Sequence, residues 1–217
     1  MIRHAILDLL YPPRCAFCGK IGVHGVCSAC ENALPRAEHP LREGAGFGKC
    51  AAPLRYEGVV REGIRRFKFQ GATGAAESYG PILAQCVAEE LGGAFDVVTW
   101  APVSKKRLRS RGYDQAYLLA RSAARVWDVE PVSMLKKVRD NPPQSGLDAA
   151  ARRGNVLGVY EATNVEAIQN ARILLIDDII TTGSSLSECA RVLKDAGAQS
   201  VVCACLATAT TEAHVER

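Results

Sequence analysis

The 217-residue sequence has no long apolar stretch and no low-complexity tract. No segment approaches the ~18 consecutive apolar residues of a membrane helix, so we expect no insertion into a membrane. The N-terminal segment 1–15 has an apolar stripe, but it contains Asp8 and reaches Pro12 and Pro13 without a small-residue cleavage site. It therefore does not resemble a signal peptide, and we predict a cytoplasmic protein.

Histidines and aromatic residues are also scarce. The four histidines are scattered, and aromatic residues make up 6% of the chain. No Ser-His-Asp or Cys-His arrangement indicates a covalent nucleophile. Three aromatic residues are candidates for stacking on a base, although core packing is the simpler role for each: Tyr56, Trp100 and Tyr113.

Positive charge is concentrated in two short segments, although the net charge is only +4. One holds Lys105, Lys106, Arg107, Arg109 and Arg111, and the other holds Arg61, Arg65, Arg66 and Lys68. Such patches suit a phosphate-bearing ligand or nucleic acid, but a solvated protein surface gives the same pattern.

Four of the nine cysteines form two CxxC pairs near the N-terminus. Cys15 and Cys18 are followed, after eight residues, by Cys27 and Cys30. Four thiolates complete a tetrahedral zinc site and leave no position for water, so the pattern predicts structural Zn²⁺. Two redox-active dithiols are an alternative, and His24 is an alternative ligand.

The other five cysteines lie singly or on alternating positions of apolar runs, which indicates core packing: Cys50, Cys86, Cys189, Cys203 and Cys205. Segment 31–50 is rich in proline, glycine and charge and lacks a hydrophobic period, so we interpret it as a linker. We therefore divide the chain into a zinc-binding module with its linker, 1–50, and a second domain, 51–217.

The second domain alternates apolar strands with amphipathic helices. Strands are expected at 54–58, 95–103, 130–139, 156–162, 171–178 and 200–209, and helices at 59–69, 76–92, 114–127 and 184–197. Near-continuous apolar strands alternating with helices predict an α/β fold, with a parallel sheet covered by helices on both faces.

Two acids follow the apolar strand of "RILLIDDIITTGSS", residues 172–185. Ligands of open α/β sheets bind at the carboxyl ends of strands, where Asp177 and Asp178 are expected. The next residues lead into a helix and offer backbone N–H groups and hydroxyls to a phosphate: Thr181, Thr182, Gly183, Ser184 and Ser185. An ordinary helix N-cap needs only one such hydroxyl.

Two carboxylates would repel a phosphate that they faced directly. They suit the cis hydroxyls of a ribose attached to it, so both parts of the motif fit a ribose 5-phosphate. The stretch "ILLIDDIITTGSS" resembles the phosphoribosyl pyrophosphate (PRPP) motif of type I phosphoribosyltransferases. This resemblance implies their fold but does not identify the acceptor.

Features across nearly the whole chain are similar to those of the ComF/GntX family of competence proteins and amidophosphoribosyltransferase-like proteins. They are "LLYPPRCAFC", "APVSKKRLRSRGYDQAYLLAR", "QSGLDAAARRGNVLGVY" and the PRPP motif. Many members have a further cysteine-rich segment, of which only Cys50 remains here.

The resemblance implies a role for each matching segment. Asp177 and Asp178 would contact the ribose hydroxyls, and 181–185 would hold the 5-phosphate. Lys105 and Arg107, in "APVSKKR", would pair with the diphosphate. Segment 140–155 corresponds to a mobile loop over the reacting centre, with Arg152 and Arg153 as its candidate contacts.

The expected reaction is displacement of pyrophosphate from PRPP by a nitrogen nucleophile, with Mg²⁺ neutralising the diphosphate. The alternative is a non-catalytic or weakly catalytic protein of DNA uptake that binds single-stranded DNA or a helicase partner. Its PRPP site would then serve sensing or structure.

Overall fold

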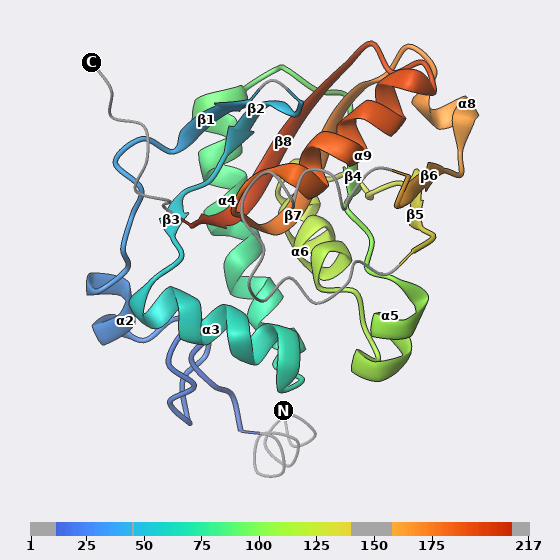
Figure 1. Cartoon of the computed structure of the whole chain (residues 1–217). Helices are drawn as coiled ribbons and strands as arrows, with labels where there is room; N and C mark the ends of the chain where they lie inside the picture. Colours follow the sequence, from blue (N-terminus) through green and yellow to red (C-terminus); the bar gives the residue numbers. More distant parts are fainter. Residues whose placement is uncertain (1–11, 45, 140–157, 210–217) are drawn as a thin grey trace.

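The computed structural model describes residues 12–44, 46–139 and 158–209. Its main sheet is mostly parallel (Figure 1), and only the pair β1–β2 is antiparallel. The strands lie in the order β1 (Leu41–Gly44), β2 (Gly48–Ala51), β8 (Ser200–Thr208), β7 (Arg172–Ile180) and β4 (Val97–Trp100), and β3 (Leu54–Arg55) also pairs with β8.

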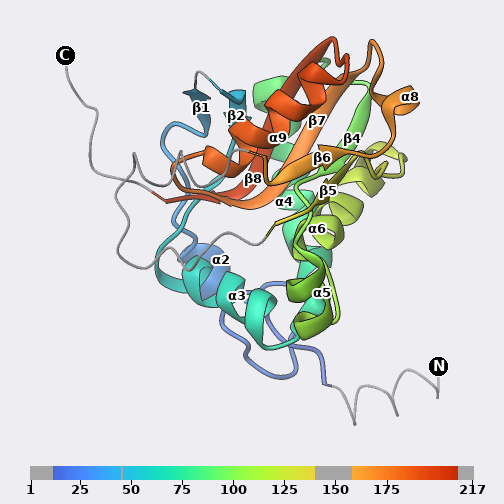
Figure 2. The same cartoon turned by 45° about the vertical axis from the view of Figure 1, so that its right-hand side comes forward.

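Helices cover both faces of this sheet. Helix α9 (Ser184–Asp195) lies on one face, and α4 (Ala76–Leu91) and α6 (Gln115–Ala124) lie on the other (Figures 1 and 2). Alternate residues of β7 join the two hydrophobic clusters, with Ile173 in the cluster of α9 and Leu174 in that of α4 and α6. Burial on both faces explains the continuous apolar run and confirms the predicted fold class.

Helix α3 (Gly58–Phe69) lies between the four-cysteine module and the main sheet (Figure 1). Val60, Ile64 and Phe67 are fully buried, as their helical spacing predicts. The smaller elements are α2 (Ser28–Asn32), η1 (Thr73–Ala75), α5 (Lys105–Arg111), η2 (Arg125–Trp127), β5 (Leu135–Lys137), β6 (Tyr160–Ala162) and α8 (Val165–Ile168).

The interpretation of 31–50 as a linker is wrong for its second half. β1 and β2 extend the sheet from β8, where Cys50 pairs in register with Cys203. The strands are four residues long and contain glycines, so they show no hydrophobic period.

Two further expectations need correction. The strands expected at 130–139 and 156–162 shorten to β5 and β6, which pair antiparallel in a separate two-stranded sheet. Helix α5 forms where only a loop was expected, because the Ser104 hydroxyl accepts a hydrogen bond from the backbone of Arg107 and caps it.

Among the described residues, no helix combines the length and the apolar character needed to cross a membrane.

Candidate functional site

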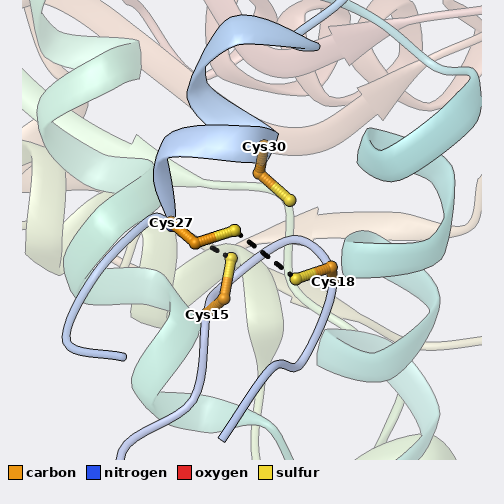
Figure 3. Close-up of side chains that lie close together, drawn as sticks. All are labelled: Cys15, Cys18, Cys27 and Cys30. Atoms are coloured by element: carbon orange, nitrogen blue, oxygen red, sulfur yellow. Dashed lines mark hydrogen bonds between the residues drawn. The ribbon is translucent and has the colours of Figure 1, made fainter. Parts of the chain in front are cut away.

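The two CxxC pairs meet in one cluster (Figure 3). The Sγ atoms of Cys15, Cys18, Cys27 and Cys30 all lie within 4.8 Å of one another. The Cys18 and Cys27 sulfurs are 3.7 Å apart, which matches the ~3.8 Å edge of a tetrahedron with Zn–S bonds of ~2.3 Å. One four-thiolate group favours structural zinc over two separate dithiols.

The backbone favours the thiolate form of Cys15, whereas burial and the neighbouring cysteines raise the pKa of Cys30. Burial raises the pKa of Cys15, but backbone hydrogen bonds from Cys18, Cys27 and Phe17 outweigh it and lower that pKa to about 6. One of them runs from the Cys27 N–H to the Cys15 sulfur at 3.3 Å. His24 is exposed and lies outside the cluster. All nine cysteines are free thiols, as expected for metal ligands and core residues.

Asp177 and Asp178 lie near the end of β7, although the strand continues through Ile180. Asp178 is 3% exposed, whereas Asp177 is partly exposed and accepts a hydrogen bond at 2.8 Å from the Asp178 N–H. Burial and the neighbouring Asp178 charge raise the pKa of Asp177 to about 7. The two carboxylates therefore form an electrostatically costly pair.

Lys68 offsets part of this cost. Its ammonium lies 2.8 Å from Asp178 Oδ1, and the side chains are 19% and 5% exposed. The other carboxylate oxygen, Oδ2, is buried and has no hydrogen-bond partner among the described residues. The sequence analysis named Lys68 only as part of a basic segment and did not pair it with Asp178.

The hydroxyl-rich turn starts α9. Gly183 is the N-cap residue in a left-handed conformation, φ +75°, and no side chain caps the helix. The hydroxyls of Thr182 and Ser184 instead lie 2.8 Å from each other. Ser185 lies close to the buried Tyr160 of β6. The five residues 181–185 thus form one turn directly after the aspartates, with more hydroxyls than capping requires.

Two residues from the presumed linker hold this turn. A Cβ atom on Gly183 would lie 2.3 Å from the Phe47 ring, so glycine is required there for close packing. Arg42 of β1 donates to the Thr181 carbonyl at 3.3 Å and to the Thr208 hydroxyl at 2.9 Å. Neither contact could be predicted from local sequence patterns, since both depend on the placement of β1 and β2 in the sheet.

The segment 101–104 after β4 is also fixed. The Ala101 N–H donates to the Ile176 carbonyl at 2.9 Å, and the Val103 N–H donates to Asp114 Oδ2 at 3.0 Å. Lys105 and Arg107 follow on exposed positions of α5.

A cavity of about 990 Å³ lies beside α5 and β5. Lys105 and Lys137 are among its lining residues, whereas Arg107 is not. Lys137 also lies over the Tyr160 ring, 5.1 Å from its centroid, and its charge lowers the pKa of Asp177. This part of the molecule therefore offers an anion lysines from two different elements, α5 and β5.

The aromatic candidates are engaged in packing. Trp100 contacts Tyr117 with ring centroids 4.8 Å apart, and the Tyr113 hydroxyl donates to the Phe67 carbonyl, although both side chains line the cavity. Tyr56 packs against the core. Arg152 and Arg153, with the rest of 140–155, lie outside the described residues.

Comparisons with known proteins match both parts of the chain. A phosphoribosyl transferase domain model matches residues 110–216, and a double zinc ribbon domain model matches residues 6–61. Competence protein F of Haemophilus influenzae is 26% identical over 214 residues, which cover 87% of this chain and 93% of the relative. The chain is therefore a homologue of proteins named competence protein F and ComFC.

Two further relatives are similar to large parts of this chain. Competence protein ComFC of Bacillus subtilis is 27% identical over 184 residues, covering 84% of this chain and 72% of the relative. DNA utilization protein YhgH of Escherichia coli K12 is 30% identical over 115 residues, covering 51% and 48%.

The double zinc ribbon match makes Cys50 a residue of interest. It is fully buried in β2, and within the described part of the chain only the four N-terminal cysteines form a metal-ligand group.

Proposed function

We propose that this competence protein F relative binds PRPP and transfers its phosphoribosyl group to a nitrogen acceptor. The observation that carries the proposal is the continuous site at the end of β7, where two carboxylates precede a turn of four hydroxyl residues around Gly183. The match to a phosphoribosyl transferase domain supports it.

The ribose is assigned to the two carboxylates. One buried oxygen of Asp178 has no hydrogen-bond partner in the part of the chain that the structure describes, and it could accept a hydrogen bond from a ligand hydroxyl. Asp177 is partly exposed beside it. The 5-phosphate is assigned to 181–185, where the N–H groups at the start of α9 favour an anion.

The diphosphate is assigned to the region of α5. Lys105 and Arg107 provide positive charge there, and Lys137 adds charge from β5. Mg²⁺ bound with the diphosphate would neutralise part of its charge, and the carboxylate oxygens of Asp177 and Asp178 are the hard donors that Mg²⁺ prefers.

The reaction needs no covalent intermediate with the protein. A nitrogen lone pair of the acceptor forms a bond to C1 of the ribose, the bond from C1 to the diphosphate oxygen breaks, and pyrophosphate leaves with that electron pair. A proton on the nitrogen passes to solvent. The protein contributes by holding the two reactants in position and by placing positive charge near the leaving group.

A role in DNA uptake is the second candidate. Relatives are named for competence and DNA utilization, and the positively charged residues Lys105, Lys106, Arg107 and Arg109 are all exposed on α5. Single-stranded DNA or a helicase would be the partner, and the PRPP site would serve sensing or structure.

An assay of pyrophosphate release distinguishes the transferase from the role in DNA uptake. The protein is incubated with PRPP, Mg²⁺ and a panel of bases and amines, and single-stranded DNA is titrated in parallel at several salt concentrations. Acceptor-dependent release without DNA binding supports the transferase. DNA binding that weakens steeply with salt, without release for any acceptor, supports the uptake role and contradicts transfer.

A further inference from the structure

Helix α3 contacts both the cysteine cluster and the proposed ligand site. Its buried residues Val60, Ile64 and Phe67 share a hydrophobic cluster with Cys15 and Cys30. Its last turn carries Lys68, the partner of Asp178. One 12-residue helix thus joins two sites that the sequence places about 150 residues apart.

The loop that carries Cys15 and Cys18, the zinc loop, packs against Gly63 of α3 and leaves no space there for a side chain. A Cβ atom on Gly63 would lie 2.7 Å from the Tyr79 hydroxyl and 3.0 Å from both the Ala16 carbonyl oxygen and Phe17 Cα, and the last two atoms lie between the first two cysteines. Tyr79 of α4 holds the same loop, because its hydroxyl donates to the Ala16 carbonyl at 2.7 Å. The loop that carries Cys15 and Cys18 therefore rests directly on α3.

Arg66 adds an electrostatic link. One guanidinium nitrogen, Nη2, is buried and has no hydrogen-bond partner among the described residues. The Arg66 side chain also approaches the zinc loop, because a Cβ atom on Gly19, the residue after Cys18, would lie 3.3 Å from Arg66 Nε. Zinc held by Cys15, Cys18, Cys27 and Cys30 would give the centre two net negative charges, which would complement this guanidinium.

The other end of α3 is fixed against the ligand site. The Tyr113 hydroxyl donates to the Phe67 carbonyl, and the Arg111 guanidinium lies 5.0 Å from the centroid of the Phe69 ring. Between these contacts, Lys68 reaches Asp178 at 2.8 Å. Since both partners are largely buried, the pair fixes the carboxylate in one orientation.

We propose that Lys68 is a positioning residue, which orients Asp178 for the ribose hydroxyls, and that the zinc loop keeps Lys68 in place through α3. This inference rests on the proposed binding of PRPP. It gives the zinc module a role in ligand binding although no zinc ligand touches the ligand site.

Substitution of Lys68 tests the first half. Lys68→Met should weaken PRPP binding at least about tenfold by calorimetry, because a hydrogen bond from a charged group is lost at the carboxylate. Lys68→Arg should retain most of the affinity. Arg65→Met is the matched control, since Arg65 lies on the same helix and is exposed near Glu62. Equal affinities of Lys68→Met and Arg65→Met would overturn the positioning role.

Two variants test the link to zinc. Gly63→Ala should push the zinc loop away from α3 and weaken PRPP binding, whereas Gly74→Ala, which meets no atom within 4 Å, should leave it unchanged. Cys18→Ser should release zinc and speed amide hydrogen exchange over 64–69, with α9 unaffected. Unchanged exchange in the zinc-free protein would contradict the link.

A failure of the proposed function is distinguishable from a failure of this inference. If the unaltered protein does not bind PRPP, the proposed function is wrong, and amide exchange over 176–181 then tests the orientation of Asp178 by itself. Lys68→Met should speed this exchange relative to Arg65→Met; equal rates would overturn the inference.

Discussion

At the residue scale, side chains from distant segments lie beside the motif at the end of β7: Lys68 contacts Asp178, and Phe47 packs against Gly183. Asp177 and Asp178 were proposed from the sequence because they follow an apolar run directly, which is a local pattern. Lys68 and Phe47 were not, because their contacts with Asp178 and Gly183 join segments that lie far apart in the chain. Local periodicity carries no information on such pairs.

The carboxylate pair predicts a pH-dependent stability. The pKa of Asp177 is raised to about 7, so the folded protein binds more protons than the unfolded chain between about pH 4 and pH 7, and stability falls as pH rises through this window. Asp177→Asn should therefore increase the free energy of unfolding more at pH 8 than at pH 6, measured by denaturant titration. A gain equal at both pH values, or equal to that of exposed Asp195→Asn, would contradict this.

Replacement of Gly183 by alanine should cost more stability than the same replacement at Gly93. Alanine at a positive φ costs about 1–2 kcal/mol, both at Gly183 and at Gly93, but the methyl group of Gly183→Ala also overlaps the Phe47 ring. Gly93→Ala is the control, with φ +74° and no atom within 4 Å. Thermal unfolding should show a larger loss for Gly183→Ala. Equal losses would mean that Phe47 moves aside without cost.

At the element scale, prediction succeeded where a hydrophobic stripe exists. Helices α3, α4 and α9 each bury one apolar face, and their spacing revealed them. Helix α5 was missed because its sequence, KKRLRSR, has no such stripe and none of its residues is buried. The strands β1 and β2 were missed because sheet pairing, not side-chain pattern, defines them.

The cap of α5 has a testable consequence. A seven-residue exposed helix has little stability of its own, and the Ser104 hydroxyl satisfies one of its free N–H groups. Ser104→Ala should cost about 1 kcal/mol locally and speed amide exchange over 105–111. The exchange of buried α6 serves as the internal control. Unchanged exchange in α5 would show that the cap does not hold the helix.

At the scale of the whole molecule, the four-cysteine module shares a hydrophobic cluster with α3, α4 and α6. The division of the chain at residue 50 was drawn from composition and stays a prediction. The shared hydrophobic cluster joins residues from both sides of this division. Chelation of zinc should lower the midpoint of a single unfolding transition seen by calorimetry, because loss of the module exposes the common core. A separate low-temperature transition, with the main transition unchanged, would show that the module folds independently.

The central claim is that the end of β7 holds the ribose 5-phosphate part of PRPP. Its most direct test is calorimetric titration of PRPP with Mg²⁺ into the zinc-loaded protein and into the double variant Asp177→Asn/Asp178→Asn, with Asp195→Asn as control. We predict one binding site per chain, lost in the double variant and kept in the control, with zinc near one equivalent in all three. Equal PRPP binding by the double variant, or none by the unaltered protein, would contradict the claim.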